Sequence, residues 1–183
     1  MIKKIVKDIE SCLENDCPFG ALALALTLPD ICGKAEYPKE KLTNRRYIDW
    51  YNKFIGNFER DRSKSLGDSP TELPFLSGEL VYQLRCSFLH AGDTDIDQKN
   101  IHDEQNQHLD FFLELRNHTD LLAASTSAGV EIGKNGDVEQ RRYTVGVAYL
   151  CKVLAGASLD YYEKNRNKFQ FNYKIVDRCN ERK

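Results

Sequence analysis

Apolar residues recur at helical spacing through most of this 183-residue chain, and this periodicity most limits its fold. In residues 2–13 the apolar side chains fall three or four positions apart, with charged residues between them, which is typical of an amphipathic helix. The same reasoning predicts further helices. They span residues 19–32, 43–58, 77–91 and 145–165.

Four residues at the ends of these segments suggest where the helices begin and stop. Pro29 has no backbone N–H to donate, so we expect the regular part of the second helix to end early, with Gly33 as its stop. Thr43 is a residue type that caps helix starts, and Gly92 one that follows helix ends. The aromatic face of the third helix is predicted to be core. Its residues are Tyr47, Trp50, Tyr51, Phe54 and Phe58.

The pattern changes to strict alternation after residue 108. Leu109, Phe111 and Leu113 alternate with other side chains, which is typical of a strand. Asn135-Gly136 is a hairpin-turn signal between two further apolar stretches. Residues 59–75 and 93–106 are predicted to be loops.

The predicted fold class is therefore mainly α. We expect one domain over residues 1–183, a bundle of about five helices with a small antiparallel β insertion at 109–143 before the C-terminal helix, and a polar tail at 166–183.

Composition excludes several classes of protein. The chain is 41% hydrophobic and 30% charged, and its longest nearly apolar run, residues 20–29, is about half of the ~20 residues that a membrane span needs. Charges interrupt the first ten residues, where a signal peptide requires an apolar stretch. We expect a cytoplasmic protein with no membrane partner.

The six cysteines show no Cys-x-x-Cys pair and no zinc-ligand spacing. Cys32, Cys86 and Cys151 lie in apolar stretches and are predicted to be reduced core residues.

No cofactor and no metal is predicted. The acidic positions of Asp93, Asp95 and Asp97, with Glu104 at the twelfth position, resemble a calcium loop, but Gln98 stands where the sharp turn of such a loop requires glycine.

Charge is unevenly spread along a chain whose net charge is −2. Residues 34–64 carry a net charge of +4 and residues 133–183 a net charge of +5, whereas residues 65–132 carry −9. The basic stretches are expected either to be solvated helix faces or to form surfaces that contact phosphate.

One pair of residues stands out as a candidate catalytic site: Arg85 and His90, at the end of the predicted helix 77–91. Arg85 is the only basic residue between Lys64 and Lys99. A guanidinium beside an apolar face needs a carboxylate or phosphate partner, and a histidine can move a proton at neutral pH. Together they have the chemistry to cleave an RNA phosphodiester without metal, with the histidine as acid or base and the arginine as phosphate anchor.

Helix geometry adds a condition to this hypothesis. Five residues turn an ideal helix by about 500°, which leaves the two side chains ~140° apart and about 7.5 Å apart along the axis. One helix is therefore expected to bring them together poorly. A second copy of the chain, packed across a two-fold axis, would supply the missing convergence.

The string Leu84-Arg85-x-x-x-Leu89-His90-x-Gly92 at a helix end in a small helical domain resembles the HEPN family (higher eukaryotes and prokaryotes nucleotide-binding domains). Many members carry Arg-x4–6-His and act as metal-independent endoribonucleases in toxin–antitoxin, abortive-infection and CRISPR systems. The resemblance implies a homodimer with Arg85 and His90 as the catalytic pair at its interface, an RNA substrate, and an antitoxin or nucleotidyltransferase as a partner protein.

Other interpretations of the same residues stay open. In the structural alternative, Arg85 pairs with a carboxylate such as Glu79 or Asp93. His90 then interacts with the free carbonyl groups at the C-terminal end of the helix. The protein would then be a catalytically silent HEPN-like module for binding or dimerisation. Because residues 65–132 are acidic, RNA binding near Arg85 requires basic residues from 34–64 or 133–183 to fold beside it.

Overall fold

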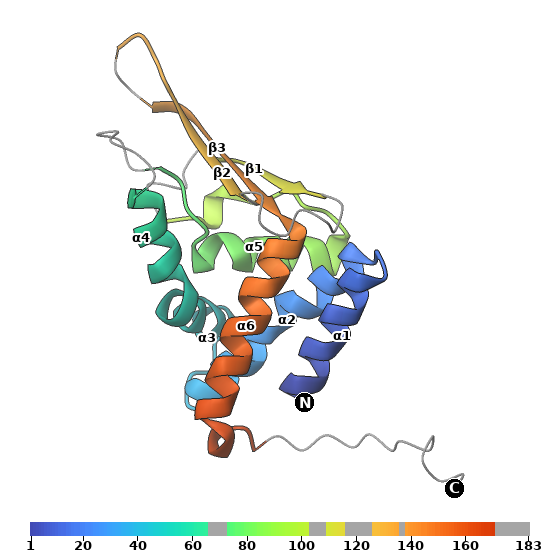
Figure 1. Ribbon diagram of the computed structural model, residues 1–183. Coiled ribbons are helices and arrows are strands. Elements are labelled where there is room, and N and C mark those ends of the chain that lie inside the picture. The colour runs from blue at the N-terminus through green and yellow to red at the C-terminus, as the bar shows by residue number, and fades with distance from the viewer. Residues whose placement is uncertain (66–72, 103–108, 116–125, 136–137, 171–183) are drawn as a thin grey trace, which may run out of the picture.

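The computed structural model describes residues 1–65, 73–102, 109–115, 126–135 and 138–170. Within these residues, α-helices form a bundle and a three-stranded sheet lies at one end of it (Figure 1). The prediction of a largely helical fold is confirmed. No helix in these ranges is both long enough and apolar enough to cross a membrane.

Helix α2 (Pro18–Glu36) is the centre of the bundle. It packs against α1 (Ile2–Glu14), α6 (Val147–Lys164), α3 (Thr43–Tyr51) and α5 (Gly78–Ala91). In Figure 1 it lies behind α6, between α1 and α3. Most of its apolar residues are buried because neighbours cover the helix on most sides. They include Leu22, Ala25, Leu26, Leu28 and Cys32.

Helix α2 does not end where the sequence predicts. It continues through Pro29 and Gly33 to Glu36, so the predicted early end was wrong. Pro29 removes one backbone hydrogen bond, but it is buried, and packing of the surrounding helix outweighs that loss. Gly33 is needed for packing rather than for a stop, since a Cβ there would lie 2.5 Å from the carbonyl oxygen of Arg46 in α3. The extra turn carries Lys34 and Glu36.

The predicted helix 43–58 is the beginning of a longer helical run. α3 is followed by a π-helical turn (Asn52–Gly56) and by α4 (Asn57–Ser65). Thr43 does not cap the run, because Leu42 occupies the capping position and the Thr43 hydroxyl accepts a hydrogen bond from Arg46 instead. The loop predicted over 59–75 is therefore helical as far as Ser65, and 66–72 lie outside the described residues.

The π turn changes which side of the helix faces the core. Tyr47, Trp50 and Tyr51 before it are fully buried, whereas Phe58 after it is 67% exposed. Phe54, within the turn, is 38% exposed. A π turn inserts an extra residue, which rotates the following face by about 100°. The prediction that Phe54 and Phe58 are core residues was therefore wrong.

Helix α5 begins and ends where the sequence predicts. The Ser77 hydroxyl caps it by accepting a hydrogen bond from the Leu80 backbone N–H at 3.2 Å. Gly92 follows its last residue with φ of 67°, a left-handed conformation that favours glycine. This fixed end positions His90 in the last turn.

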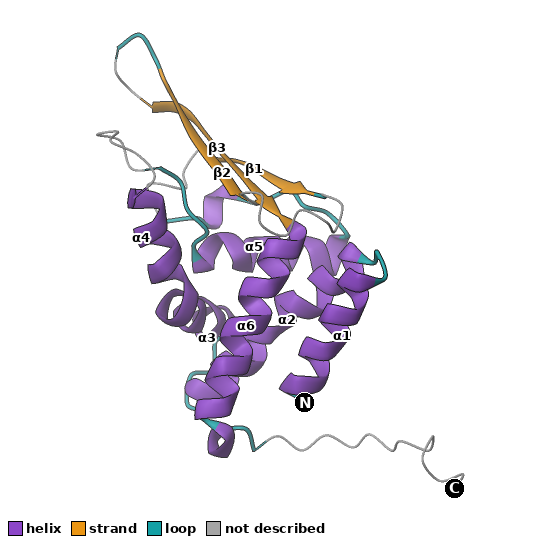
Figure 2. Cartoon of the chain, in the orientation of Figure 1, coloured by secondary structure: helices purple, strands orange, loops and turns teal. Residues whose placement is uncertain are grey.

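The three strands form a mixed sheet in the order β1-β3-β2. β2 (Thr126–Ile132) and β3 (Val138–Gly146) form the predicted antiparallel hairpin, which extends away from the helices (Figure 2). β1 (Leu109–Glu114) pairs with β3 in parallel, so the prediction of an antiparallel sheet was wrong for this strand. β3 also runs to Gly146, three residues beyond the insertion predicted to end at 143, and leads directly into α6.

Two of the three cysteines predicted to be core residues are buried. Cys32 and Cys151 are buried as predicted, whereas Cys86 is only half-buried. No described cysteine forms a disulfide, and Cys179 lies outside the described residues.

A short 3-10 turn (Gln98–Asn100) interrupts the predicted loop 93–106, of which 103–106 lie outside the described residues. Another (Arg166–Lys168) opens the predicted tail, of which 171–183 are outside.

The close contact between α2 and α3 yields a stability prediction. Replacing Gly33 with alanine should lower the free energy of unfolding by about 1–3 kcal/mol, because the new methyl group meets the Arg46 backbone. Gly156→Ala is the matched control: Gly156 lies in α6, and a Cβ at this position would have nothing within 4 Å, so alanine should stabilise the protein by about 0.5–1 kcal/mol. Urea denaturation measures both. A Gly33→Ala protein as stable as the wild type would contradict this packing.

Candidate functional site

Arg85 and His90 meet on the surface of α5. The Arg85 Nη1 atom lies 3.0 Å from His90 Nε2. The expectation that a single helix brings the pair together poorly was wrong. The long arginine side chain spans the angular and axial separation of the two backbone positions.

The chemistry of the two groups sets the direction of a hydrogen bond at this contact. A guanidinium has only donors, so Arg85 Nη1 must donate and His90 Nε2 must accept. An imidazole that accepts at Nε2 is neutral and carries its proton on Nδ1. The arrangement therefore presents the Nε2 ring nitrogen beside a permanent positive charge.

A third residue, Asp30 of α2, fixes the orientation of the guanidinium. Its Oδ2 atom lies 3.2 Å from Arg85 Nε and 3.1 Å from Arg85 Nη2, and both side chains are 20% exposed. Arg85 thus has the carboxylate partner that the sequence requires, but the partner is neither Glu79 nor Asp93. The Glu79 carboxylate instead accepts from the backbone N–H of His102.

Partial burial changes the electrostatics of this ion pair. Burial raises the pKa of Asp30 above its usual value, and the opposing effects of Arg85 and Arg46 do not fully offset it. Burial also disfavours the charge on Arg85, but Asp30 and a hydrogen bond with Cys86 outweigh it, so the pKa of Arg85 is raised. The Asp30 Oδ1 atom is buried and has no hydrogen-bond partner among the described residues.

Sequence reasoning missed Asp30, although a signal was present. Asp30 is the one charged residue between Asp16 and Lys34, in an otherwise apolar stretch. A carboxylate in a buried helix needs a cation from another element, and Arg85 is isolated in the same way in its own segment.

An aromatic pair lies on the same two helices. Phe88 of α5, between Arg85 and His90 in sequence, stacks on Phe19 of α2 with ring centroids 6.2 Å apart. Phe19 is 56% exposed. The surface around the candidate catalytic pair therefore combines charged groups with an uncovered aromatic ring.

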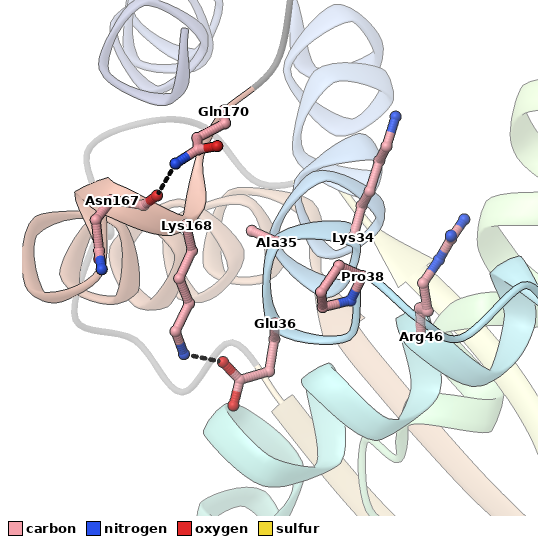
Figure 3. Close-up of a pocket in the computed structure, with 8 residues that line it drawn as sticks. All are labelled: Lys34, Ala35, Glu36, Pro38, Arg46, Asn167, Lys168 and Gln170. Atoms are coloured by element: carbon pink, nitrogen blue, oxygen red, sulfur yellow. Dashed lines mark hydrogen bonds and ion pairs between the residues drawn. The ribbon is translucent and has the colours of Figure 1, made fainter.

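A pocket of about 630 Å³ lies at the end of α2 (Figure 3). It is formed where the last turn of α2, the start of α3 and the segment after α6 meet. Figure 3 shows the Lys34 and Arg46 side chains extending in the same direction, and Glu36 and Lys168 pointing toward one another. The lining residues are Lys34, Ala35, Glu36, Pro38, Arg46, Asn167, Lys168 and Gln170.

Glu36 is the acidic residue of the pocket, and its charge is compensated. It accepts hydrogen bonds from Lys53 Nζ at 2.7 Å, Lys168 Nζ at 2.5 Å and the Tyr161 hydroxyl at 2.8 Å. Burial disfavours its charged form, but these bonds and the lysine charges outweigh that effect and lower the pKa of Glu36 to about 2. The carboxylate is thus ionised at neutral pH and held by two cations.

Arg46 connects the pocket with the Arg85 site. Its Nη1 donates to the Glu40 carbonyl at 3.0 Å and its Nη2 to the Thr43 hydroxyl at 3.2 Å, which fixes the guanidinium. Its charge also acts on Asp30, where it lowers the pKa. The basic segment 34–64 therefore contributes positive charge close to Asp30 and Arg85.

Metal ligands are not gathered in the described part of the chain, where no three His, Cys, Asp or Glu side chains form a group suited to a metal ion. Asp93 accepts hydrogen bonds from the backbone N–H groups of Thr94 and Asp95, as in a local turn. Glu104, the last acidic position of the calcium-like pattern, lies outside the described residues.

Comparisons of this chain with protein-family models, with curated proteins and with solved structures found no match. Its function must therefore be inferred from the geometry of the site.

The environment of Glu36 predicts a pH-dependent stability. Because its folded-state pKa is about 2, below the usual 4.5, it stabilises the fold above about pH 4.5, and this contribution disappears as the pH falls toward 2. Glu36→Gln should lower the free energy of unfolding by about 2 kcal/mol at pH 7 and have a much smaller effect near pH 2. Denaturant titrations at both pH values measure this. An equal loss at the two pH values would contradict the ion-pair assignment.

Proposed function

We propose that this protein is a HEPN-like domain that acts as a metal-independent endoribonuclease in a bacterial defence or toxin–antitoxin setting in the cytoplasm. Arg85 and His90 form its catalytic pair. The observation that supports the proposal most is the 3.0 Å contact between Arg85 Nη1 and His90 Nε2, which places a cation and a proton acceptor at one point of the surface. Both groups can then reach the same phosphodiester.

The proposed reaction uses the neighbouring hydroxyl of the RNA itself. His90 Nε2 accepts the proton of a 2′-hydroxyl, and the 2′-oxygen forms a bond to the adjacent phosphorus. The bond from phosphorus to the 5′-oxygen of the next nucleotide breaks, and that oxygen takes up a proton. The products are a 2′,3′-cyclic phosphate and a 5′-hydroxyl. Arg85 stabilises the negative charge that grows on the phosphoryl oxygens.

In this mechanism Asp30 is a positioning residue. It occupies the Nε and Nη2 side of the guanidinium, which leaves Nη1 directed toward His90. A substrate phosphate would approach from the Nη1 side and displace the arginine from the imidazole, which leaves Nε2 ready to accept a proton. The ion pair with Asp30 holds the guanidinium during this exchange.

A second copy of the chain would complete the site. The base and the acid act on opposite sides of the phosphorus, so one His90 would accept the 2′-hydroxyl proton, and His90 of a two-fold-related copy, protonated once the strand has displaced its own Arg85, would donate to the leaving oxygen. The exposed Phe19 ring beside Phe88 supports a homodimer with this surface at its interface. The resemblance to HEPN proteins adds an antitoxin or nucleotidyltransferase as a proposed partner protein.

A second candidate function is a catalytically silent module of the same architecture, for binding or dimerisation. The Asp30–Arg85 ion pair favours it, because a guanidinium already neutralised by a carboxylate has less need for a phosphate. Cleavage assays separate the two functions.

The catalytic proposal predicts RNA cleavage in the presence of EDTA. His90→Ala should reduce the rate by at least about 10²-fold, the usual contribution of a general acid or base. Arg85→Lys should also reduce it strongly, since lysine keeps the charge but loses the planar donors that contact both His90 and Asp30. Gel analysis of a structured RNA over time measures the rates.

His102→Ala is the matched control, because His102 is an exposed histidine whose backbone, not its ring, binds Glu79. It should cleave at the wild-type rate. Cleavage that survives both Arg85→Ala and His90→Ala would reject the assignment, and no cleavage by the wild type would favour the silent module.

The dimer proposal predicts a sedimentation mass about twice the 21.1 kDa of the chain. Phe19→Glu should dissociate the dimer, because it places a charge in the proposed apolar contact. Phe58→Glu changes a similarly exposed phenylalanine on α4 and should leave the mass unchanged. Sedimentation velocity measures all three proteins, and a monomeric wild type that cleaves RNA would contradict the two-fold site.

A further inference from the structure

We infer that the pocket at the end of α2 binds phosphate groups of the RNA strand that is cleaved at Arg85 and His90. This inference rests on the proposed function and extends it with a second binding site on the same strand. The pocket joins the two basic segments of the chain, because Lys34 and Arg46 come from residues 34–64 and Lys168 from residues 133–183.

The charges of the pocket favour an anion. Of the described residues that line it, Lys34, Arg46 and Lys168 are cations and Glu36 is the one carboxylate. The negative charge of Glu36 is neutralised by ion pairs with Lys168 and with Lys53, which lies outside the lining. Among the described residues that line the pocket, cations outnumber carboxylates, a composition that a phosphate backbone complements.

The donors of the pocket are held in place before a ligand arrives. Arg46 is fixed by the Glu40 carbonyl and the Thr43 hydroxyl, and its buried Nε has no hydrogen-bond partner among the described residues. Gln170 donates its amide to the Asn167 carbonyl. Groups that are already ordered lose less entropy when they bind, so this arrangement suits recognition of a charged strand.

The position of the pocket ties it to the proposed catalytic pair. Lys34 follows Asp30 by four residues on α2, which places it one turn and about 6 Å further along the axis. Asp30 in turn contacts Arg85, and the charge of Arg46 acts on Asp30. We therefore place the phosphates that neighbour the one at Arg85 on Lys34 and Arg46.

The size of the pocket indicates more than a single phosphate. Its volume of about 630 Å³ lies within the range of sites that hold whole small molecules. Ala35 and Pro38 give part of the wall an apolar character that suits a ribose or a base. We therefore assign the pocket to a nucleotide segment of the strand, with its phosphates on the three cations.

Salt-dependent binding of a non-cleavable RNA tests this inference without any need for catalysis. The probe is a fluorescein-labelled 2′-O-methyl RNA of about 12 nucleotides, and fluorescence anisotropy gives its affinity for the full-length protein at several salt concentrations. Each phosphate contact contributes about 0.7 to the slope of log affinity against log salt for a single strand. Lys34→Gln and Lys168→Gln should each make the slope shallower by about that amount.

Lys4→Gln is the control, because Lys4 is an exposed lysine of α1 outside the pocket. The slope of log affinity against log salt for this variant should equal that of the wild type. Thermal unfolding of each variant verifies that it is folded. Slopes that do not change in the pocket variants, or a wild type that does not bind the RNA, would overturn the inference. So would full displacement of the RNA by adenosine monophosphate at an equal concentration of phosphate groups, since the pocket would then bind free nucleotides.

The two proposals fail in different ways. A wild-type protein that binds the probe with pocket-dependent salt slopes but cleaves no RNA supports the strand-binding pocket and rejects the nuclease. The opposite result is RNA cleavage that depends on Arg85 and His90, with salt slopes of RNA binding that do not change in the Lys34→Gln and Lys168→Gln variants. This result supports the nuclease and overturns this inference.

Discussion

The arrangement of the site depends on one partly buried carboxylate. Asp30 is the single charged residue in the apolar stretch of α2, and burial raises its pKa. A carboxylate in such a place must be compensated by cations from neighbouring helices. Arg85 of α5 supplies a direct ion pair, and Arg46 of α3 supplies a more distant charge. This single requirement brings basic groups of α3 and α5 toward α2 and orients Arg85 toward His90.

Close backbone contacts hold these three helices in register. α3 lies against both α2 and α5, and each crossing contains a glycine. A Cβ at Gly33 would meet the Arg46 carbonyl oxygen at 2.5 Å, and one at Gly78 would meet the Ile48 carbonyl oxygen at 2.8 Å. The side chain of Asn52, in the π turn, also accepts the Gly78 backbone N–H at 2.8 Å. These contacts therefore set how closely α2 and α5 approach α3.

Local signals in the sequence predicted much of the fold. The helical periodicity located α1, α5 and α6, and the caps of α5 followed from Ser77 and Gly92 because capping depends on residues close in sequence. The end of α2 was missed at Pro29, because packing against other helices outweighs a local preference. The parallel pairing of β1 with β3 was missed for a similar reason, since alternation specifies a strand but not its neighbour.

The candidate site was predicted only in part. The sequence identified Arg85 and His90 and required a partner for the guanidinium, but Asp30 is 55 residues away from Arg85 and only the packing of α2 on α5 makes it that partner. Ideal helix geometry also suggested that the pair would diverge, because it describes backbone positions and not the reach of an arginine side chain. The pocket beyond Asp30 depends on the extra turn of α2, which no local signal around Pro29 and Gly33 indicates.

We propose that His90 and Arg85 act together on a phosphodiester through the 2′-hydroxyl of the RNA. The most direct test is the chemical identity of the ends produced when the wild-type protein cleaves a defined RNA, determined by mass spectrometry, beside the same RNA with a single 2′-deoxy substitution at the cleaved nucleotide. We predict 2′,3′-cyclic phosphate and 5′-hydroxyl ends, and no cleavage at the substituted position. Ends with a 3′-hydroxyl and a 5′-phosphate, or undiminished cleavage at the 2′-deoxy position, would contradict the mechanism.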